Sequence, residues 1–148
     1  MIENTQSISR YFTWGEAVNS QTAARRGIDN TPNDEARSNI LMAAQAMDRV
    51  RDVLGHPVHV SSWYRSPKLN AAVGGASQSA HMTGWAVDFE CPQFGTPEDC
   101  IRQIKASGIP YRKIILEFPP NGWVHCDFGG DERISLVTND GKNYARAA

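Results

Sequence analysis

The longest regular pattern in the chain predicts an amphipathic helix between residues 31 and 54. Thr31 is placed to cap its start, Pro32 would occupy the first helical position, and Gly55 would end it. Apolar residues recur over this stretch at helical spacing, at Ile40, Ala43, Ala44, Met47, Val50 and Leu54. A helix of about five or six turns with a single apolar stripe has to bury that stripe against something flat.

The remaining segments predict strands and shorter helices. Strands are expected at residues 57–66, 84–92, 113–118 and 122–128, with a further edge strand at 133–138. Additional helices are expected at 13–19, 67–73 and 96–109, and the last ten residues are expected to form a loose tail. Because helices and strands do not alternate strictly, the pattern favours an α+β fold with a largely antiparallel sheet.

Composition limits the domain count and the partners. The 148 residues show no internal repeat and no shift in composition, which indicates one domain over residues 1–148 with its core at about 10–130. A net charge of −1 supplies no basic field for nucleic acid, and no apolar run is long enough to span a bilayer. The N-terminal residues lack a secretory signal pattern, so we expect synthesis in the cytoplasm.

The three cysteines do not form a CxxC pair, which argues against a thiolate zinc site. Cys91 and Cys100 are close enough in sequence to bridge a short loop in an oxidising compartment. Synthesis in the cytoplasm favours free thiols instead.

Two predicted strands combine an apolar face with a face that carries potential ligands. Along residues 85–89, Trp85, Val87 and Phe89 share one face and Asp88 lies on the other. Along residues 123–128 the alternation gives one apolar face, and the opposite face carries Trp123, His125 and Asp127.

A metal site is predicted from residues on both strands and the loop before the first. Gly84 allows a sharp turn between His81 and Asp88, so that both can converge on one point. His125 would complete a set of two histidines and one carboxylate, and three protein ligands with an open fourth position are typical of catalytic zinc. His56 and His59 are expected to be a surface loop residue and a sheet residue without this role.

Three motifs occur together in the order of the chain. They are S-x-Y-R-S at residues 62–66, S-x-H-x-x-G-x-A-x-D at 79–88 and W-x-H at 123–125. In combination they resemble the zinc D-Ala-D-Ala carboxypeptidases and related peptidoglycan peptidases of the M15 type, and the chain looks closest to their compact phage and bacterial branch. The resemblance implies the small α+β fold shared with hedgehog signalling domains, in which helices pack on one side of a central antiparallel sheet.

The resemblance also implies roles for single residues. Zn²⁺ would be held by His81, Asp88 and His125. Arg65 corresponds to the family arginine that holds a substrate carbonyl or carboxylate, and a guanidinium suits that task because it can pair with an oxyanion in two places. Further substrate contacts are expected from Ser79, Gln78, Tyr64 and Trp123.

The catalytic base stays open between two carboxylates. Several branches of the family carry it in a Glu-x-x-His motif, but the corresponding position here is Gly122. Glu117 ends an apolar strand, and the Pro-Pro-Asn-Gly turn would bring His125 back beside it, so we favour Glu117. Asp127 is the alternative base. If it is not catalytic, its expected role is to orient a histidine.

The expected function is therefore a zinc metallopeptidase that cleaves peptidoglycan stem peptides, as a D-Ala-D-Ala carboxypeptidase or as an endopeptidase. A phage lysin or tail-associated enzyme would fit, acting on the wall after release or as part of a phage particle, and we expect a monomer. One alternative is a non-catalytic, zinc-containing module that binds the wall or serves in a phage structure. Another is an amidase that uses Cys126 as nucleophile, which its expected place on the apolar face disfavours.

Overall fold

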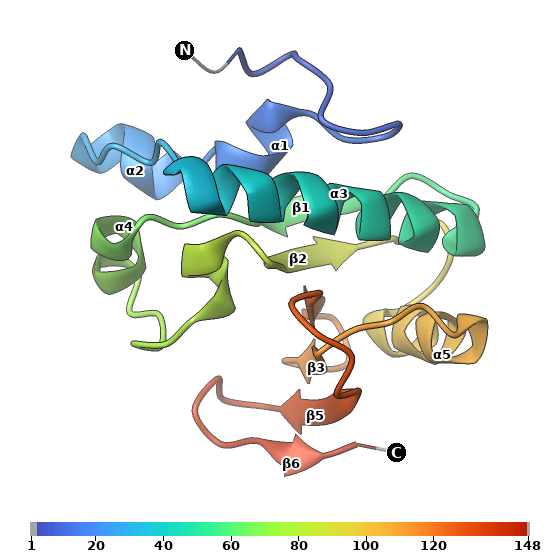
Figure 1. Cartoon of the computed structure of the whole chain (residues 1–148). Helices are drawn as coiled ribbons and strands as arrows, with labels where there is room; N and C mark the ends of the chain where they lie inside the picture. The colour runs from blue at the N-terminus through green and yellow to red at the C-terminus, as the bar shows by residue number, and fades with distance from the viewer. Residues whose placement is uncertain (1–2, 148) are drawn as a thin grey trace.

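The computed structural model describes residues 3–147 and has an α+β architecture built around one mixed sheet (Figure 1). The strands lie in the order β1-β2-β4-β3-β5-β6, and every neighbouring pair is antiparallel except β3 and β5. Their bounds are β1 His59–Ser62, β2 Ala86–Glu90, β3 Lys113–Glu117, β4 Trp123–Asp127, β5 Ile134–Thr138 and β6 Ala145–Arg146. The predicted fold class is confirmed.

Within residues 3–147, five α-helices and one short 3₁₀ helix precede or connect these strands. They are α1 Trp14–Val18, α2 Gln21–Arg26, α3 Asp34–Leu54, α4 Pro67–Ala72, the 3₁₀ helix η1 Ala80–Thr83, and α5 Pro97–Ser107. In Figure 1 the long helix α3 runs across the β1–β2 end of the sheet, and α5 lies beside β3. Among the described residues, no helix has the length and hydrophobicity needed to cross a bilayer.

The core lies between the two long helices and one face of the sheet. The six predicted stripe residues of α3 are all at most 3% exposed, which confirms the predicted contact face. They share one hydrophobic cluster with alternate residues of the central strands, which are Val87, Phe89, Val124, Cys126, Ile114 and Leu116. The opposite face of the same strands carries Asp88, His125 and Glu117. Asp88 pairs with His125, and Glu117 lies two residues after Ile115, which also pairs with His125.

The start of α3 differs from the prediction. Asn33, and not Thr31, is the N-cap, because its side chain accepts a hydrogen bond from the Ala36 backbone N–H. The helix therefore begins at Asp34, two residues later than the Thr-Pro signal indicates. Gly55 ends it in the left-handed conformation, as predicted.

The C-terminal region was predicted wrongly in two respects. Strand β5 is interior and not an edge, because it pairs in parallel with β3 and antiparallel with β6. The expected loose tail contains β6, so the segment after β5 forms a hairpin that extends the sheet. Residue 148 lies outside the described residues.

The three cysteines all lie in the interior of the protein. Cys91, Cys100 and Cys126 are free and buried. Burial raises the pKa of Cys126 well above its usual value, and a buried neutral thiol is a poor nucleophile.

Candidate metal centre

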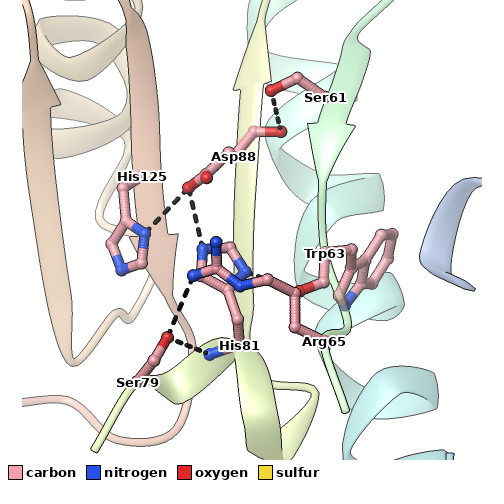
Figure 2. Close-up of polar contacts among 7 residues, drawn as sticks. All are labelled: Ser61, Trp63, Arg65, Ser79, His81, Asp88 and His125. Carbon is pink, nitrogen blue, oxygen red and sulfur yellow. Dashed lines mark hydrogen bonds and ion pairs between the residues drawn. The ribbon is translucent and has the colours of Figure 1, made fainter. Parts of the chain in front are cut away.

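Two histidines converge on one carboxylate on the sheet face opposite α3 and α5 (Figure 2). His81 Nε2 lies 3.2 Å from Asp88 Oδ1, and His125 Nδ1 lies 2.9 Å from the same oxygen. The potential ligand atoms of all three residues lie within 4.8 Å of one another. The register places Asp88 directly opposite His125 on neighbouring strands, so the sheet itself sets this pair.

His81 comes from outside the sheet and is held by the chain that follows β1. Its Nδ1–H donates to the Trp63 carbonyl at 2.6 Å, and its backbone carbonyl accepts from the Arg65 N–H at 3.0 Å. Ser79 caps η1 by accepting from the His81 N–H. These bonds fix the ring so that Nε2 points toward Asp88.

Gly84 is required by both conformation and space. Its φ of 88° lies in the left-handed region, and a Cβ there would come within 2.8 Å of the Ala36 carbonyl oxygen and 2.9 Å of Ile40. The residue therefore lets η1 pack directly against α3 before β2 begins. The predicted turn between His81 and Asp88 is confirmed, together with the reason for a glycine.

The donor set fits a cation. Because Nδ1 of His81 carries the proton donated to Trp63, its Nε2 presents a lone pair to the Asp88 carboxylate, and two acceptors at this distance repel without a cation or proton between them. Burial alone would raise the pKa of Asp88, but His81 and His125 outweigh it and hold that pKa well below its usual range. Two imidazoles and a carboxylate suit zinc.

The site opens into a cleft of about 660 Å³ on the same face of the sheet. Its lining includes all three potential ligands and also Arg65, Gln78, Ser79, Glu117, Trp123 and Asp127. Tyr64 does not line this cleft, because its side chain is 5% exposed and packs in the core. The cleft thus brings together every predicted site residue except Tyr64.

The family model described as Peptidase M15 matches residues 10–127, which is most of the chain. The chain belongs to the peptidase M15 family. The matched region contains all three motifs that carried the resemblance in sequence. A comparison with curated proteins gave no match.

In this M15 chain, the Glu117 carboxylate enters the cleft from the end of β3. Glu117 pairs in register with Trp123 and lies one alternate position beyond Ile115, which pairs with His125. Burial raises the pKa of Glu117, and the negative charge of Asp88 raises it further. A raised pKa brings a carboxyl group closer to the pH range in which it can both take and give a proton.

The departure from Glu-x-x-His has a steric explanation. Gly122 follows the cis Pro119–Pro120 bond, and a Cβ at this position would overlap the Glu117 carbonyl oxygen. No side chain can occupy that position without moving the turn. On the cleft face, Glu117 is the carboxylate that pairs directly with Trp123, the first residue of β4.

Asp127 is committed to other partners. Its carboxylate accepts from Arg112 Nε at 2.6 Å and from the Gly129 N–H at 2.8 Å, and its side chain is 3% exposed. Neither of these hydrogen bonds involves a histidine. Arg112 was missed in the sequence, since nothing in its local pattern marks it as the partner of a residue fifteen positions away.

Arg65 reaches the cleft with part of its guanidinium unused. Its Nη2 donates to Ser79 Oγ at 3.3 Å, whereas its buried Nε has no hydrogen-bond partner. Burial lowers the pKa of Arg65, although Asp88 and Glu117 counteract this. The side chain therefore offers a donor to an acceptor inside the cleft.

Proposed function

We propose that this M15 chain is a zinc-dependent peptidase that hydrolyses peptide bonds in peptidoglycan stem peptides. The observation that carries the proposal is the convergence of His81, Asp88 and His125 in a cleft that also receives Glu117 and Arg65. The peptidase family and the chemistry of the donor set both support it. Because the wall lies outside the cytoplasm, the protein would act after release or as part of a phage particle.

Three residues would hold the metal, and the sheet and η1 would orient them. His81 would ligate through Nε2 and His125 through Nδ1, with a carboxylate oxygen from Asp88. When bound there, zinc would polarise the scissile carbonyl and increase the acidity of water.

Glu117 would act as the general base and then as the general acid. Its carboxylate would take a proton from the attacking water and deliver it to the leaving amine. The raised pKa of Glu117 favours the first of these transfers, because the carboxylate of a weaker acid accepts a proton more readily. Asp127 is less suited, because both of its described partners would have to release it first.

Arg65 would stabilise the negative charge that forms on the carbonyl oxygen. Arg65 lines the cleft beside Ser79, so its guanidinium is placed to donate to a substrate oxygen there. Ser79 and Gln78, which line the same cleft, would contact the substrate backbone, and Trp123 would form part of the wall.

The test is incubation of the zinc-loaded protein with defined muropeptides, followed by mass spectrometry of the products. We expect peptide-bond cleavage that a chelator abolishes and added zinc restores. Release of D-alanine would identify a carboxypeptidase, whereas shorter stems or separated cross-links would identify an endopeptidase. Retained zinc with no cleavage of any wall peptide would instead support the binding-module alternative.

A further inference from the structure

The turn between β5 and β6 forms one rim of the metal cleft. Asp140, Gly141, Lys142 and Tyr144 all line it, although they lie beyond the region matched by the family model. β5 ends at Thr138, which pairs with Glu117, so the turn begins beside the proposed base.

The turn is held in one conformation by its own polar groups. The Asp140 carboxylate accepts from the Lys142 N–H at 2.8 Å, the Asn143 N–H at 2.8 Å and Asn143 Nδ2 at 2.7 Å. The buried Thr138 hydroxyl oxygen accepts from the Gly141 N–H at 2.9 Å. The backbone that carries Lys142 is therefore fixed before any ligand arrives, which reduces the entropy lost on binding.

The charges along the cleft leave the Lys142 ammonium without a partner. Asp127 is paired with Arg112, Asp140 is used within the turn, and Asp88 is a proposed metal ligand. Four basic side chains and four carboxylates line the cleft, so a bound divalent cation would leave an excess of two positive charges. Among the described residues, Lys142 has no ion pair. A ligand that supplies a carboxylate would offset one of these two charges.

Tyr144 adds a neutral hydrogen-bonding group to the same rim. Its hydroxyl donates to the Gly141 carbonyl at 3.2 Å, which holds the ring against the turn. Burial raises the pKa of Tyr144, and the charges of Glu117 and Asp140 raise it further, so the hydroxyl remains protonated. The hydroxyl oxygen can still accept, and the proton can be redirected to a ligand oxygen.

We propose that Lys142 and Tyr144 form a carboxylate-binding subsite at the rim of the metal cleft, and that the preferred substrate is a peptide with a free carboxylate close to the scissile bond. This inference rests on the proposed function and narrows its substrate class. The ammonium of Lys142 pairs with the carboxylate, and the Tyr144 hydroxyl contributes a hydrogen bond. Both residues are binding residues and do not act on the reacting atoms.

The test compares a stem peptide that ends in a free carboxylate with the same peptide as its C-terminal amide. For Lys142→Met we expect KM for the acid form to rise about tenfold, kcat to change less than about twofold, and KM for the amide to stay unchanged. Lys142→Arg should keep the preference for the acid form, since it keeps the charge. The matched control is Lys68→Met, because Lys68 is an exposed residue of α4 that does not line the cleft.

Tyr144→Phe should raise KM for the acid form by about two- to fivefold, which is less than the effect of Lys142→Met, because only one hydrogen bond is lost. Equal effects of Lys142→Met on the acid and the amide, or no effect on either, would overturn the subsite.

Failure of the proposed function can be recognised separately. If the zinc-loaded protein hydrolyses neither peptide, both peptides are titrated into it by calorimetry. Tighter binding of the acid form that is lost in Lys142→Met upholds the subsite without turnover. Equal affinities for acid and amide in the unaltered protein overturn it.

Discussion

One face of the central sheet is covered by α3 and α5, whereas the opposite face carries the histidines, carboxylates and basic side chains of the cleft. On the covered face, Val87 and Val124 are fully buried and need only apolar neighbours. On the cleft face, Asp88 and Asp127 are also buried, and each requires charged or hydrogen-bonding partners. Neighbouring residues of one strand therefore lie in different environments. We expect substitutions on the covered face to change stability and substitutions on the cleft face to change activity.

The largest contrast is expected on β4, between His125 and its neighbour Val124. His125→Ala removes a proposed metal ligand, so peptide hydrolysis should fall about 10³-fold or more and bound zinc should be lost. Val124→Ala, on the covered face, should lower the free energy of unfolding by about 2 kcal/mol and leave kcat unchanged. Metal analysis, kinetics and denaturant unfolding of both variants measure this, and unchanged zinc content in His125→Ala would break the comparison.

The second contrast separates the metal from the base. Glu117→Gln keeps the size of the side chain but not its basicity, so kcat should fall about 10²- to 10⁴-fold while zinc content stays the same. Activity is measured on the peptide that the unaltered protein cleaves best. A fully active Glu117→Gln variant would show that another group takes the proton.

A large substitution on the covered face should affect stability alone. Phe89 follows Asp88 directly and is fully buried among the helices. Phe89→Ala should lower the free energy of unfolding by about 3–5 kcal/mol, measured by denaturant titration. The folded fraction should retain its kcat, and a loss of kcat comparable to that of Glu117→Gln would mean that the two faces are not independent.

Asp127 lies on the cleft face and should nevertheless have a mainly structural effect. Asp127→Asn keeps one acceptor for Arg112 or Gly129 but removes the charge, so we expect less than about a tenfold loss of kcat and a loss of about 1–2 kcal/mol in stability. The same kinetic and unfolding measurements apply. If this variant loses more activity than Glu117→Gln, Asp127 and not Glu117 is the base.

The smallest effect is expected from thiol modification. Burial raises the pKa of Cys100 to about 11 and that of Cys126 well above its usual value, so at neutral pH few thiolates form. Native protein treated with iodoacetamide at pH 7.5 should stay unlabelled at these positions by mass spectrometry and remain fully active. Rapid inactivation together with labelling of Cys126 would favour the cysteine amidase instead.

The two faces also differ in how far the sequence predicts them. Alternation along residues 85–89 and 123–128 was enough to separate core positions from ligand positions, because side-chain direction in a strand follows directly from sequence position. The stripe of α3 was predictable for the same kind of reason. The convergence of the three candidate ligands could be predicted because their motifs are specific and their strands alternate regularly.

The remaining features depend on contacts between distant segments. The parallel pairing of β3 with β5 and the two-residue strand β6 have no periodic signal, so the sequence alone predicts only a tail there. For the same reason Lys142 and Tyr144 were not connected with the cleft. Helix α2 was also missed, although Ser20 at its start and Gly27 at its end are ordinary capping signals, because six residues are too few for an apolar stripe.

The position of the metal tests the central claim most directly. Crystals of the zinc-loaded protein, measured on both sides of the zinc absorption edge, should give one strong anomalous peak on the cleft face. The peak should lie about 2.0–2.2 Å from His81 Nε2, His125 Nδ1 and a carboxylate oxygen of Asp88. A peak at other residues, or the absence of a peak between these three side chains in zinc-loaded crystals, would contradict the account.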